Sequence, residues 1–448
     1  MSNHRIRTAR LSPSLRSTPP ETPENPESPK NTVRWRRRLI LSAVPALALL
    51  AVGPSACAGD DSTPPSDEVE PSPVPTAEDS GAVDAGSDAD GDATSVDASC
   101  ADDCEHFVTA CTADVLCPNG LFDPLQPQGG ADEFDGRTTI HLIRGTSAND
   151  VWVLGGVGAV AHFDGTSWVR SSPPPPALSP QGLPPTLLTL WLRSEQAVGI
   201  TGFDELYTQE LAPTSDPDAG GYEWTRFGRL SPAINGAAQT IMCGWAPPGS
   251  ESFWMASVPP VITTRNRPSV LRLRASGPAT IGAAVFASNI GTFLGMHGAS
   301  ADELWAVGIG GVTLRITGAD GNTPTTQAYD SQTRNALHGV WAASSTEAWS
   351  VGFAGTIRHY TGDPLRWDVV PGISEEFQLS AVWGTSPSDV WAVGKNALVL
   401  HYDGTQWTRV TIAGLGSRRP DLTTVWASDP KHVWIGGQGV VLSFGGKP

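Results

Sequence analysis

The sequence is short of charge and of tyrosine, and one long segment contains no basic residue. Only 17% of its 448 residues are charged, against about a quarter in average proteins, and only five are Tyr. No Lys or Arg occurs between Leu39 and Gly136, and the net charge is −17. A chain with this balance has no electrostatic basis for binding nucleic acid, so we predict no nucleic-acid partner.

Common catalytic motifs are also missing. The sequence contains no P-loop, no Gly-x-Ser-x-Gly and no His-Glu-x-x-His. Four histidines have no metal-ligand spacing: His141, His297, His338 and His432. We therefore predict a protein that is not an enzyme, without a cofactor, a metal site or catalytic residues. Acidic side chains that the fold brings together would escape this reasoning, so a carbohydrate-active enzyme stays an alternative.

An export signal is present near the N-terminus. Residues 34–38 contain four arginines, residues 39–52 are largely apolar, and small residues follow up to Cys57. A basic region, an apolar region and a small-residue break are typical of a signal peptide, here 34–56. The polar lead 1–33 is unusually long and is predicted to be disordered. A start at Val33 is the alternative.

The end of this signal resembles the lipobox of bacterial lipoproteins, in which the cysteine is lipidated and becomes the first residue. Pro54 departs from the pattern, which usually has Leu at the third position before the cysteine. The resemblance implies lipidation at Cys57, an N-terminal lipid anchor in a membrane, and a place in the cell envelope, at the outer membrane or the cell surface. An ordinary signal peptide cleaved near Ala56 and an uncleaved anchor are the alternatives.

Residues 57–99 are predicted to be a disordered acidic tether. Asp, Glu, Ser, Pro, Ala and Gly dominate this segment, which offers too little apolar area to offset the entropy of ordering. The run Asp88-Ala-Asp90-Gly-Asp92 suggests calcium but lacks the spacing of an EF-hand loop. We therefore interpret the run as part of the tether.

Four cysteines lie within 18 residues after the tether: Cys100, Cys104, Cys111 and Cys117. In an exported protein they predict two disulfides rather than a zinc site, with the pairing left open. Cys243 remains and is predicted to be a buried, inert thiol. We assign 100–136 to a Cys-rich segment that also contains a closing strand.

From residue 137 onward one pattern recurs. The clearest copy runs from Leu379 through Asp389-Val-Trp-Ala-Val-Gly394 to Trp407. Seven anchor positions follow from aligning the copies, with six Trp and one Gln: Trp152, Gln196, Trp254, Trp305, Trp349, Trp391 and Trp434. Their spacing is roughly 40–45 residues in most units, which is the range of β-propeller blades.

Each unit is predicted to form four short strands. In the clearest copy these are 380–383, 390–393, 398–402 and 406–410, and Asp403-Gly404 between the last two is a typical hairpin turn. The second strand is apolar on both faces, as in sheets stacked side by side. The prediction for 137–448 is an all-β fold, a seven-bladed β-propeller of four-stranded antiparallel blades.

These repeats resemble the Asp-Val-Trp-Ala-Val-Gly repeats of secreted bacterial β-propeller proteins, many of which are lipoproteins. The resemblance covers 137–448 and implies the architecture and a surface location, but no shared activity. It is not the WD40 signature. Three histidines fall at one repeat position, and we interpret them as structural rather than metal-binding: His162, His359 and His401.

The leading functional prediction is a cell-surface binding or scaffolding module for an extracellular protein or glycan. A structural envelope protein is a further alternative. Insertions at 208–221 and 317–327 should lie on one face of the propeller and mark the binding surface, and the Pro-rich stretch 171–186 should lie on the opposite face.

The last unit has only three strands, ending at residue 444, so an unpaired edge would remain. The first unit begins with a strand at 138–143. We predict that a strand at 121–127, just before it, closes the ring.

Overall fold

The computed structural model describes residues 104–123, 128–130, 133–176, 182–211, 223–230, 239–260, 262, 268–277 and 280–446. These residues form β-strands and two short 3-10 helices, η1 (Cys104–His106) and η3 (Ile309–Gly311). None of the described helices is long and apolar enough to cross a membrane. The predicted lipidation site Cys57, the signal peptide and the tether lie outside the described residues.

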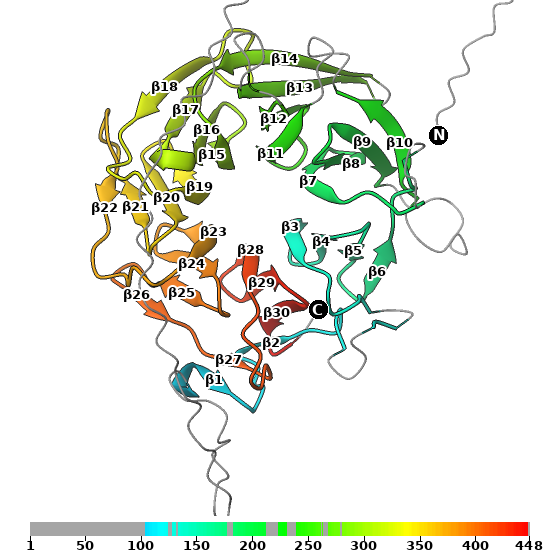
Figure 1. Cartoon of the computed structure of the whole chain (residues 1–448), viewed down its shortest axis with the longest axis vertical. Helices are drawn as coiled ribbons and strands as arrows, with labels where there is room; N and C mark the ends of the chain where they lie inside the picture. The colour runs from blue at the N-terminus through cyan, green and yellow to red at the C-terminus, as the bar shows by residue number, and fades with distance from the viewer. Residues whose placement is uncertain are drawn as a thin grey trace, which may run out of the picture. The chain divides into compact units, whose positions relative to one another are not determined.

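Six four-stranded antiparallel sheets and one six-stranded sheet surround a central axis (Figure 1). Blade 1 consists of β3 (Ile140–Ser147), β4 (Asp150–Gly155), β5 (Val160–Phe163) and β6 (Trp168–Ser171). Blade 2 consists of β7 (Leu187–Leu192), β8 (Gln196–Thr201), β9 (Glu205–Glu210) and β10 (Thr225–Arg229). Blade 3 consists of β11 (Thr240–Trp245), β12 (Ser252–Val258), β13 (Ser269–Gly277) and β14 (Thr280–Ser288). The first strand of each blade lies nearest the axis.

Blades 4 to 6 follow the same order. Blade 4 consists of β15 (Phe293–Ser300), β16 (Glu303–Gly308), β17 (Thr313–Thr317) and β18 (Thr325–Tyr329). Blade 5 consists of β19 (Leu337–Ser344), β20 (Glu347–Gly352), β21 (Ile357–Tyr360) and β22 (Asp368–Val369). Blade 6 consists of β23 (Leu379–Ser386), β24 (Asp389–Gly394), β25 (Val399–Tyr402) and β26 (Trp407–Arg409). The strands predicted for the clearest repeat are confirmed as β23 to β26, with ends that differ by up to three residues. The first strand of blade 1 is Ile140–Ser147 rather than 138–143.

The predicted count of seven four-stranded blades is wrong, because the last repeat lies in a six-stranded sheet. This closing sheet has the order β1 (Phe107–Val108), β27 (Ile412–Ala413), β2 (Leu116–Pro118), β30 (Val440–Phe444), β29 (His432–Gly437) and β28 (Leu422–Asp429). The last repeat supplies only three strands. Two strands from the N-terminal side, β1 and β2, and one strand from the link after blade 6, β27, complete the sheet.

Closure by an N-terminal strand is confirmed, but the predicted position at 121–127 is wrong. The closing strand is β2, and it pairs antiparallel with β30 through Leu116↔Phe444 and Cys117↔Ser443. Leu121 and Phe122 instead bury their side chains against blade 1 and the closing sheet, and 124–127 lie outside the described residues. β2 is an interior strand of the closing sheet, between β30 and β27.

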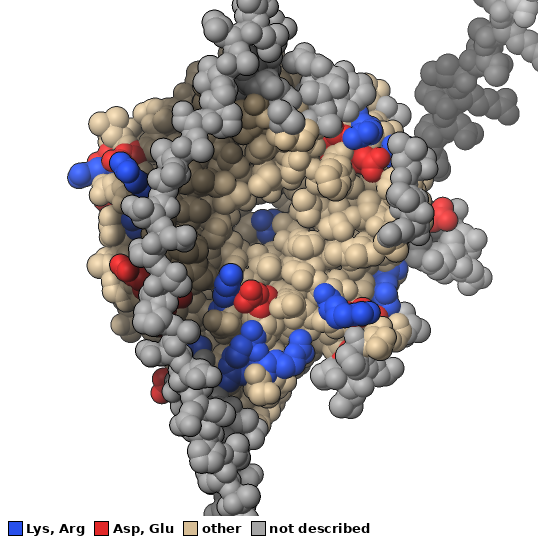
Figure 2. Space-filling model, viewed as in Figure 1, with Lys and Arg blue, Asp and Glu red and all other residues tan. Residues whose placement is uncertain are grey.

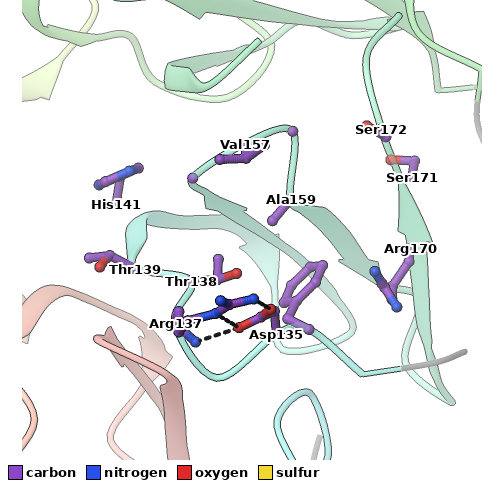
Figure 3. A pocket seen from close by; sticks show the side chains of 13 residues that line it. Asp135, Arg137, Thr138, Thr139, His141, Val157, Ala159, Arg170, Ser171 and Ser172 are labelled. Atoms are coloured by element: carbon purple, nitrogen blue, oxygen red, sulfur yellow. Dashed lines mark hydrogen bonds and ion pairs between the residues drawn. The ribbon is translucent and has the colours of Figure 1, made fainter. Parts of the chain in front are cut away.

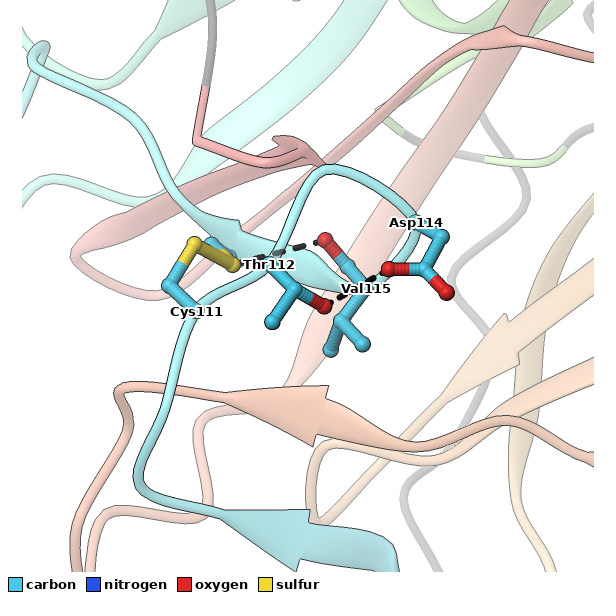
Figure 4. Close-up of a disulfide and its surroundings, with 5 residues drawn as sticks. Cys111, Thr112, Asp114 and Val115 are labelled. Atoms are coloured by element: carbon cyan, nitrogen blue, oxygen red, sulfur yellow. Dashed lines mark hydrogen bonds between the residues drawn. A yellow bond between two sulfur atoms is a disulfide. The ribbon is translucent and has the colours of Figure 1, made fainter.

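The closing strand carries one disulfide, between Cys111 and Cys117 (Figure 4). This bond confirms one pair from the Cys-rich segment and fastens the chain before β2 to the strand itself. Cys117 is 2% exposed, so the bond is anchored in the core. Cys100, and the side chain of Cys104, lie outside the described part, so the second predicted disulfide stays a prediction.

The second strand of each repeat is buried on both faces, as predicted. All six residues of β24 are buried, and the anchor tryptophans are at most 4% exposed. The anchor assigned to Gln196 is wrong by two residues. In blade 2 it is Val198 that pairs with the first strand, at Trp191, as the anchor Trp391 pairs with Trp383 in blade 6. Thr201 occupies the position that Gly394 has in blade 6. Aligning the Ala-Val-Gly of this unit with that of the other repeats therefore gave the wrong register.

The strand order defines two faces of the ring. The 2–3 face carries the turns between second and third strands and the links between blades; the 1–2 face carries the other turns. The loops after β9 and β17 both leave third strands, so they begin on the 1–2 face, and the link after β6 begins on the 2–3 face. The predicted sidedness is confirmed for these described ends, although β9 extends to Glu210, past the start predicted for the first insertion.

Candidate functional site

A layer of large side chains lies around the central channel. It consists of the first-strand residues that pair with the anchor position of each repeat: Arg144, Trp191, Trp245, His297, Trp341, Trp383 and Trp426. Several of these rings lean onto a glycine of the next sheet. A Cβ at Gly384 would come within 2.7 Å of the Trp341 ring, and one at Gly298 within 2.7 Å of Trp245. The glycines therefore allow each first strand to pack closely against its neighbour.

Trp383 reaches across the channel. Its ring centroid lies 4.8 Å from that of His297 in blade 4 and 4.7 Å from the guanidinium carbon of Arg144 in blade 1. Its indole N–H donates to the carbonyl of Ala427 at 2.9 Å. One indole thus contacts both a cation and an imidazole at the centre of the ring.

Two cavities meet at this layer. The cavity on the 1–2 side has a volume of about 310 Å³, and the one on the 2–3 side about 180 Å³. Arg144 borders both, and no other Lys or Arg, and no Asp or Glu, is among the described residues that line them. Figure 2 shows an opening at the centre of the ring with a Lys or Arg side chain inside it.

Burial shifts the pKa values of the polar groups in the channel. Burial lowers the pKa of Arg144 to about 10, so the guanidinium is still charged at neutral pH. Burial first, and then the charge of Arg144, hold the pKa of His297 well below its usual value. The imidazole is therefore neutral, and its Nδ1 accepts a hydrogen bond from the backbone N–H of Ala342 at 3.0 Å.

Cys243 also lines the channel, on the 2–3 side. It is a free thiol, as predicted, but it is half-buried rather than fully buried. Its local environment raises the pKa to about 12 through desolvation, which leaves almost no reactive thiolate at neutral pH.

The repeated histidines form structural contacts within their own blades. Each stacks on its anchor tryptophan and bonds to an acid at the start of the second strand, as in blade 6, where His401 lies 4.2 Å from Trp391 and its Nε2 lies 2.7 Å from Asp389. Blades 1 and 5 repeat this with His162 and Asp150, and with His359 and Glu347. The interpretation of these residues as structural is confirmed for these three blades, because each ring is fixed by its own sheet.

In blade 6 the acid of this motif is held ionised. Burial raises the pKa of Asp389, but hydrogen bonds from His401 and Thr385 outweigh it, so the pKa lies below its usual value. Arg315 replaces the histidine in blade 4 and bonds to Glu303 at 2.7 Å. No cluster of three or more potential metal ligands occurs within the described ranges.

The 2–3 face exposes large apolar side chains in a regular pattern. In blades 1 to 5, each turn between the second and third strands presents one apolar residue that is between 51% and 75% exposed: Val157, Phe203, Ile262, Ile309 and Phe353. Leu183, in the link between blades 1 and 2, adds a sixth. The corresponding turns of blade 6 and the closing sheet have exposed polar residues, Lys395 and Gln438.

The opposite face differs. Among the described large apolar residues that are exposed, only Leu365 lies in a turn of the 1–2 face. The three that belong to neither face lie on outer strands or in β1: Val108, Val285 and Val369. Large exposed apolar patches on a folded protein mark interaction sites, whereas scattered residues do not. One exposed apolar residue at the same turn of five successive blades is a regular arrangement rather than scatter, and it points to a contact surface on this face.

A cavity of about 880 Å³ adjoins this surface at blade 1 (Figure 3). Val157 borders it, together with His141 and an ion pair between Asp135 and Arg137. The hydrogen bonds from the Arg137 side chain and backbone lower the pKa of Asp135 to about 2. Neither this cavity nor the exposed turn residues belonged to the predicted binding surface, which the insertions at 208–221 and 317–327 placed on the opposite, 1–2 face. Only the fold brings the 2–3 turns to one face, and no described residue tests binding at the insertions.

Comparisons support the fold. No protein-family model and no curated protein sequence matches the chain. A solved structure described as YCF48 bound to D1 peptide is similar, with a TM-score of 0.52 and 15% identity, covering 75% of this chain and 96% of that one. YCF48 from Cyanidioschyzon merolae has a TM-score of 0.48 at 15% identity, covering 68% and 94%. The structure of the RRP9 WD40 repeats has a TM-score of 0.49 at 9% sequence identity, and the match covers 73% of this chain and 91% of that one. The chain is thus a β-propeller, and identities this low define the fold alone.

Proposed function

We propose that this protein is an exported, lipid-anchored binding module whose 2–3 face docks a protein partner. The observation that carries the proposal is the apolar residue exposed at the same turn of five successive blades. An extended polypeptide surface can cover several such turns at once. The similar YCF48 structure, described as bound to a peptide, is a propeller with a polypeptide ligand and supports this choice of ligand class.

The size of the effect can be worked out from one side chain. Burying an exposed Phe contributes about 1.5–3 kcal/mol, and 1.4 kcal/mol is about a tenfold change in affinity. Phe203 is 75% exposed and Phe353 is 51% exposed. Removing both should therefore weaken binding about 100-fold if a partner covers them.

The test is co-purification from envelope extracts with wild type, with the double variant Phe203→Ser and Phe353→Ser, and with Leu365→Ser on the opposite face as the matched control. A protein that the wild type and Leu365→Ser retain and the double variant loses supports the proposal. Equal retention by all three contradicts it. A glycan array with the same proteins tests the glycan alternative, which gains support if binding follows the same variants.

Export and lipidation at Cys57 form the second part of the proposal. They rest on the basic cluster at 34–38, the apolar run 39–52 and the lipobox-like end of the signal. In a host that processes lipoproteins, labelled fatty acid should attach to the wild type and not to Cys57→Ala, which should also leave the membrane fraction. Unchanged labelling in the variant would contradict this assignment.

The alternative of a carbohydrate-active enzyme has a specific structural requirement, an acidic pair about 5–10 Å apart at a channel mouth. The described residues that line the channel cavities include no Asp or Glu. The channel therefore offers no support for that alternative, and a binding function is the one we propose.

A further inference from the structure

We infer that the cavity on the 1–2 side of the channel binds a carboxylate carried on an apolar group, with Arg144 as the residue that holds the anion. This site lies on the opposite side of the ring from the proposed docking surface and does not depend on it. The argument rests on an unpaired cation, its two aromatic neighbours and the composition of the cavity wall.

Arg144 is a cation for which the described part of the chain provides no counter-ion. Its Nη1 donates to the carbonyl of Ile143 at 2.8 Å, and no carboxylate lies within ion-pair distance of it among the described residues. Arg144 is half-buried, and removing a charge from water without a partner is costly. The lowered pKa of Arg144 has the same cause, because burial is the sole contribution to it.

The guanidinium is also held in place. Its carbon atom lies over the Trp383 ring, 4.7 Å from the ring centroid, and Arg144 is one of the residues that line the cavity. A guanidinium presents paired donors that match the two oxygens of a carboxylate. A guanidinium that packs on an indole at the cavity wall therefore favours a planar anion that binds through two parallel hydrogen bonds.

His297 supplies a second donor. Since its Nδ1 accepts a hydrogen bond from Ala342 and the ring is neutral, the proton is on Nε2. His297 lines the same cavity and contacts the same indole as Arg144. One positive charge and one neutral donor fit a singly charged carboxylate better than a doubly charged phosphate.

The cavity wall defines the rest of the ligand. Trp245, Trp426, Pro247 and Leu190 line it, and its polar side chains besides Arg144 and His297 are three hydroxyls, of Thr146, Thr189 and Ser428. An acidic sugar would bury many hydroxyl groups that need partners, and the described lining has no Asp, Glu, Asn or Gln to serve them. A volume of about 310 Å³ accommodates one apolar group beside the carboxylate.

The carboxylate has two possible sources, a free apolar acid or the C-terminus of a polypeptide with an apolar last residue. Calorimetric titration of the full chain separates them with two matched pairs of probes. The first pair is 3-phenylpropionate and 3-phenylpropionamide. The second is the peptide acetyl-Ala-Ala-Phe with a free and with an amidated C-terminus.

The acid should bind at least tenfold more tightly than its amide in one pair or both, and the pair that shows this identifies the source. Arg144→Gln should reduce the affinity for the acid to that of the amide. Arg366→Gln removes an exposed guanidinium from a turn of the same face and should change nothing. Phe203→Ser, on the opposite face, should also leave acid binding unchanged.

Three outcomes would overturn the inference. They are equal binding of acid and amide in both pairs, a preference for the acid that survives Arg144→Gln, and tighter binding of inorganic phosphate or glucuronate than of either acid. The comparison of acid with amide uses the unaltered protein, so it decides the matter even if Arg144→Gln does not fold.

Discussion

Leu116 is the residue through which closure of the ring is best measured. Its side chain is fully buried in β2, in a cluster that contains Trp391 of blade 6 and Leu442 of the closing sheet. Replacement of a buried Leu by Ala costs about 2–5 kcal/mol, and the cost rises with the cavity that remains. Because β2 has a strand on each side, its surroundings cannot collapse easily. We expect Leu116→Ala to lower the free energy of unfolding by about 3–4 kcal/mol.

The assay is equilibrium unfolding in urea, followed by tryptophan fluorescence and by circular dichroism. Leu365→Ala is the matched control, since Leu365 is 67% exposed and the change should stay within about 0.5 kcal/mol. A chain that begins at residue 121 lacks β2 and should lose the cooperative transition, whereas a chain that begins at residue 100 should keep it. If Leu116→Ala and Leu365→Ala unfold alike, β2 does not close the ring.

Three further predictions concern the interior. Gly384→Ala should destabilise the protein by about 1–3 kcal/mol, because its Cβ would meet the indole of the neighbouring blade. Gly282→Ala in β14, where the nearest atom would be 3.8 Å from the new Cβ, should cost far less in the same unfolding assay. Burial raises the pKa of Asp389, but hydrogen bonds, chiefly from His401, lower it by more, so the pKa in the folded protein lies below its usual value. The ionised carboxylate therefore stabilises the fold at pH values above its usual pKa, and this stabilisation is lost as the pH falls through the lowered pKa. Asp389→Asn should therefore lose less stability than wild type between about pH 5 and pH 2, and an equal loss would contradict the argument. Cys243, with its pKa raised to about 12, should react with iodoacetamide at pH 8 far more slowly in the native protein than in urea, as mass spectrometry would show.

The repeat pattern was sufficient to predict the blades, because the buried second strand leaves a strong signal. Asp389-Val-Trp-Ala-Val-Gly394 is a complete strand, buried on both faces, with an acid at its start and a glycine at its end. The pattern was insufficient where a unit lost its tryptophan. In blade 2, Val198 occupies the anchor position and Thr201 the glycine position, so sequence identity and structural register disagree.

The closing sheet and the site depend on contacts between residues far apart in the chain. β27 pairs in parallel with both β1 and β2, although Ile412 and Ala413 looked like part of a link between units. Arg144 and Trp383 occupy equivalent positions in different repeats, and only the curvature of the ring brings them together. The exposed residues of the 2–3 turns were also hidden, since a single apolar residue in a turn carries no information about its neighbours.

The central claim is that a protein partner docks on the 2–3 face. The most direct measurement places a photo-crosslinking amino acid at Phe203, at Phe353 or, as the control on the opposite face, at Leu365, and irradiates intact cells. We predict the same protein adduct from the first two positions and none from the third. An adduct from Leu365 alone, or no protein adduct from either position on the 2–3 face, would contradict the claim.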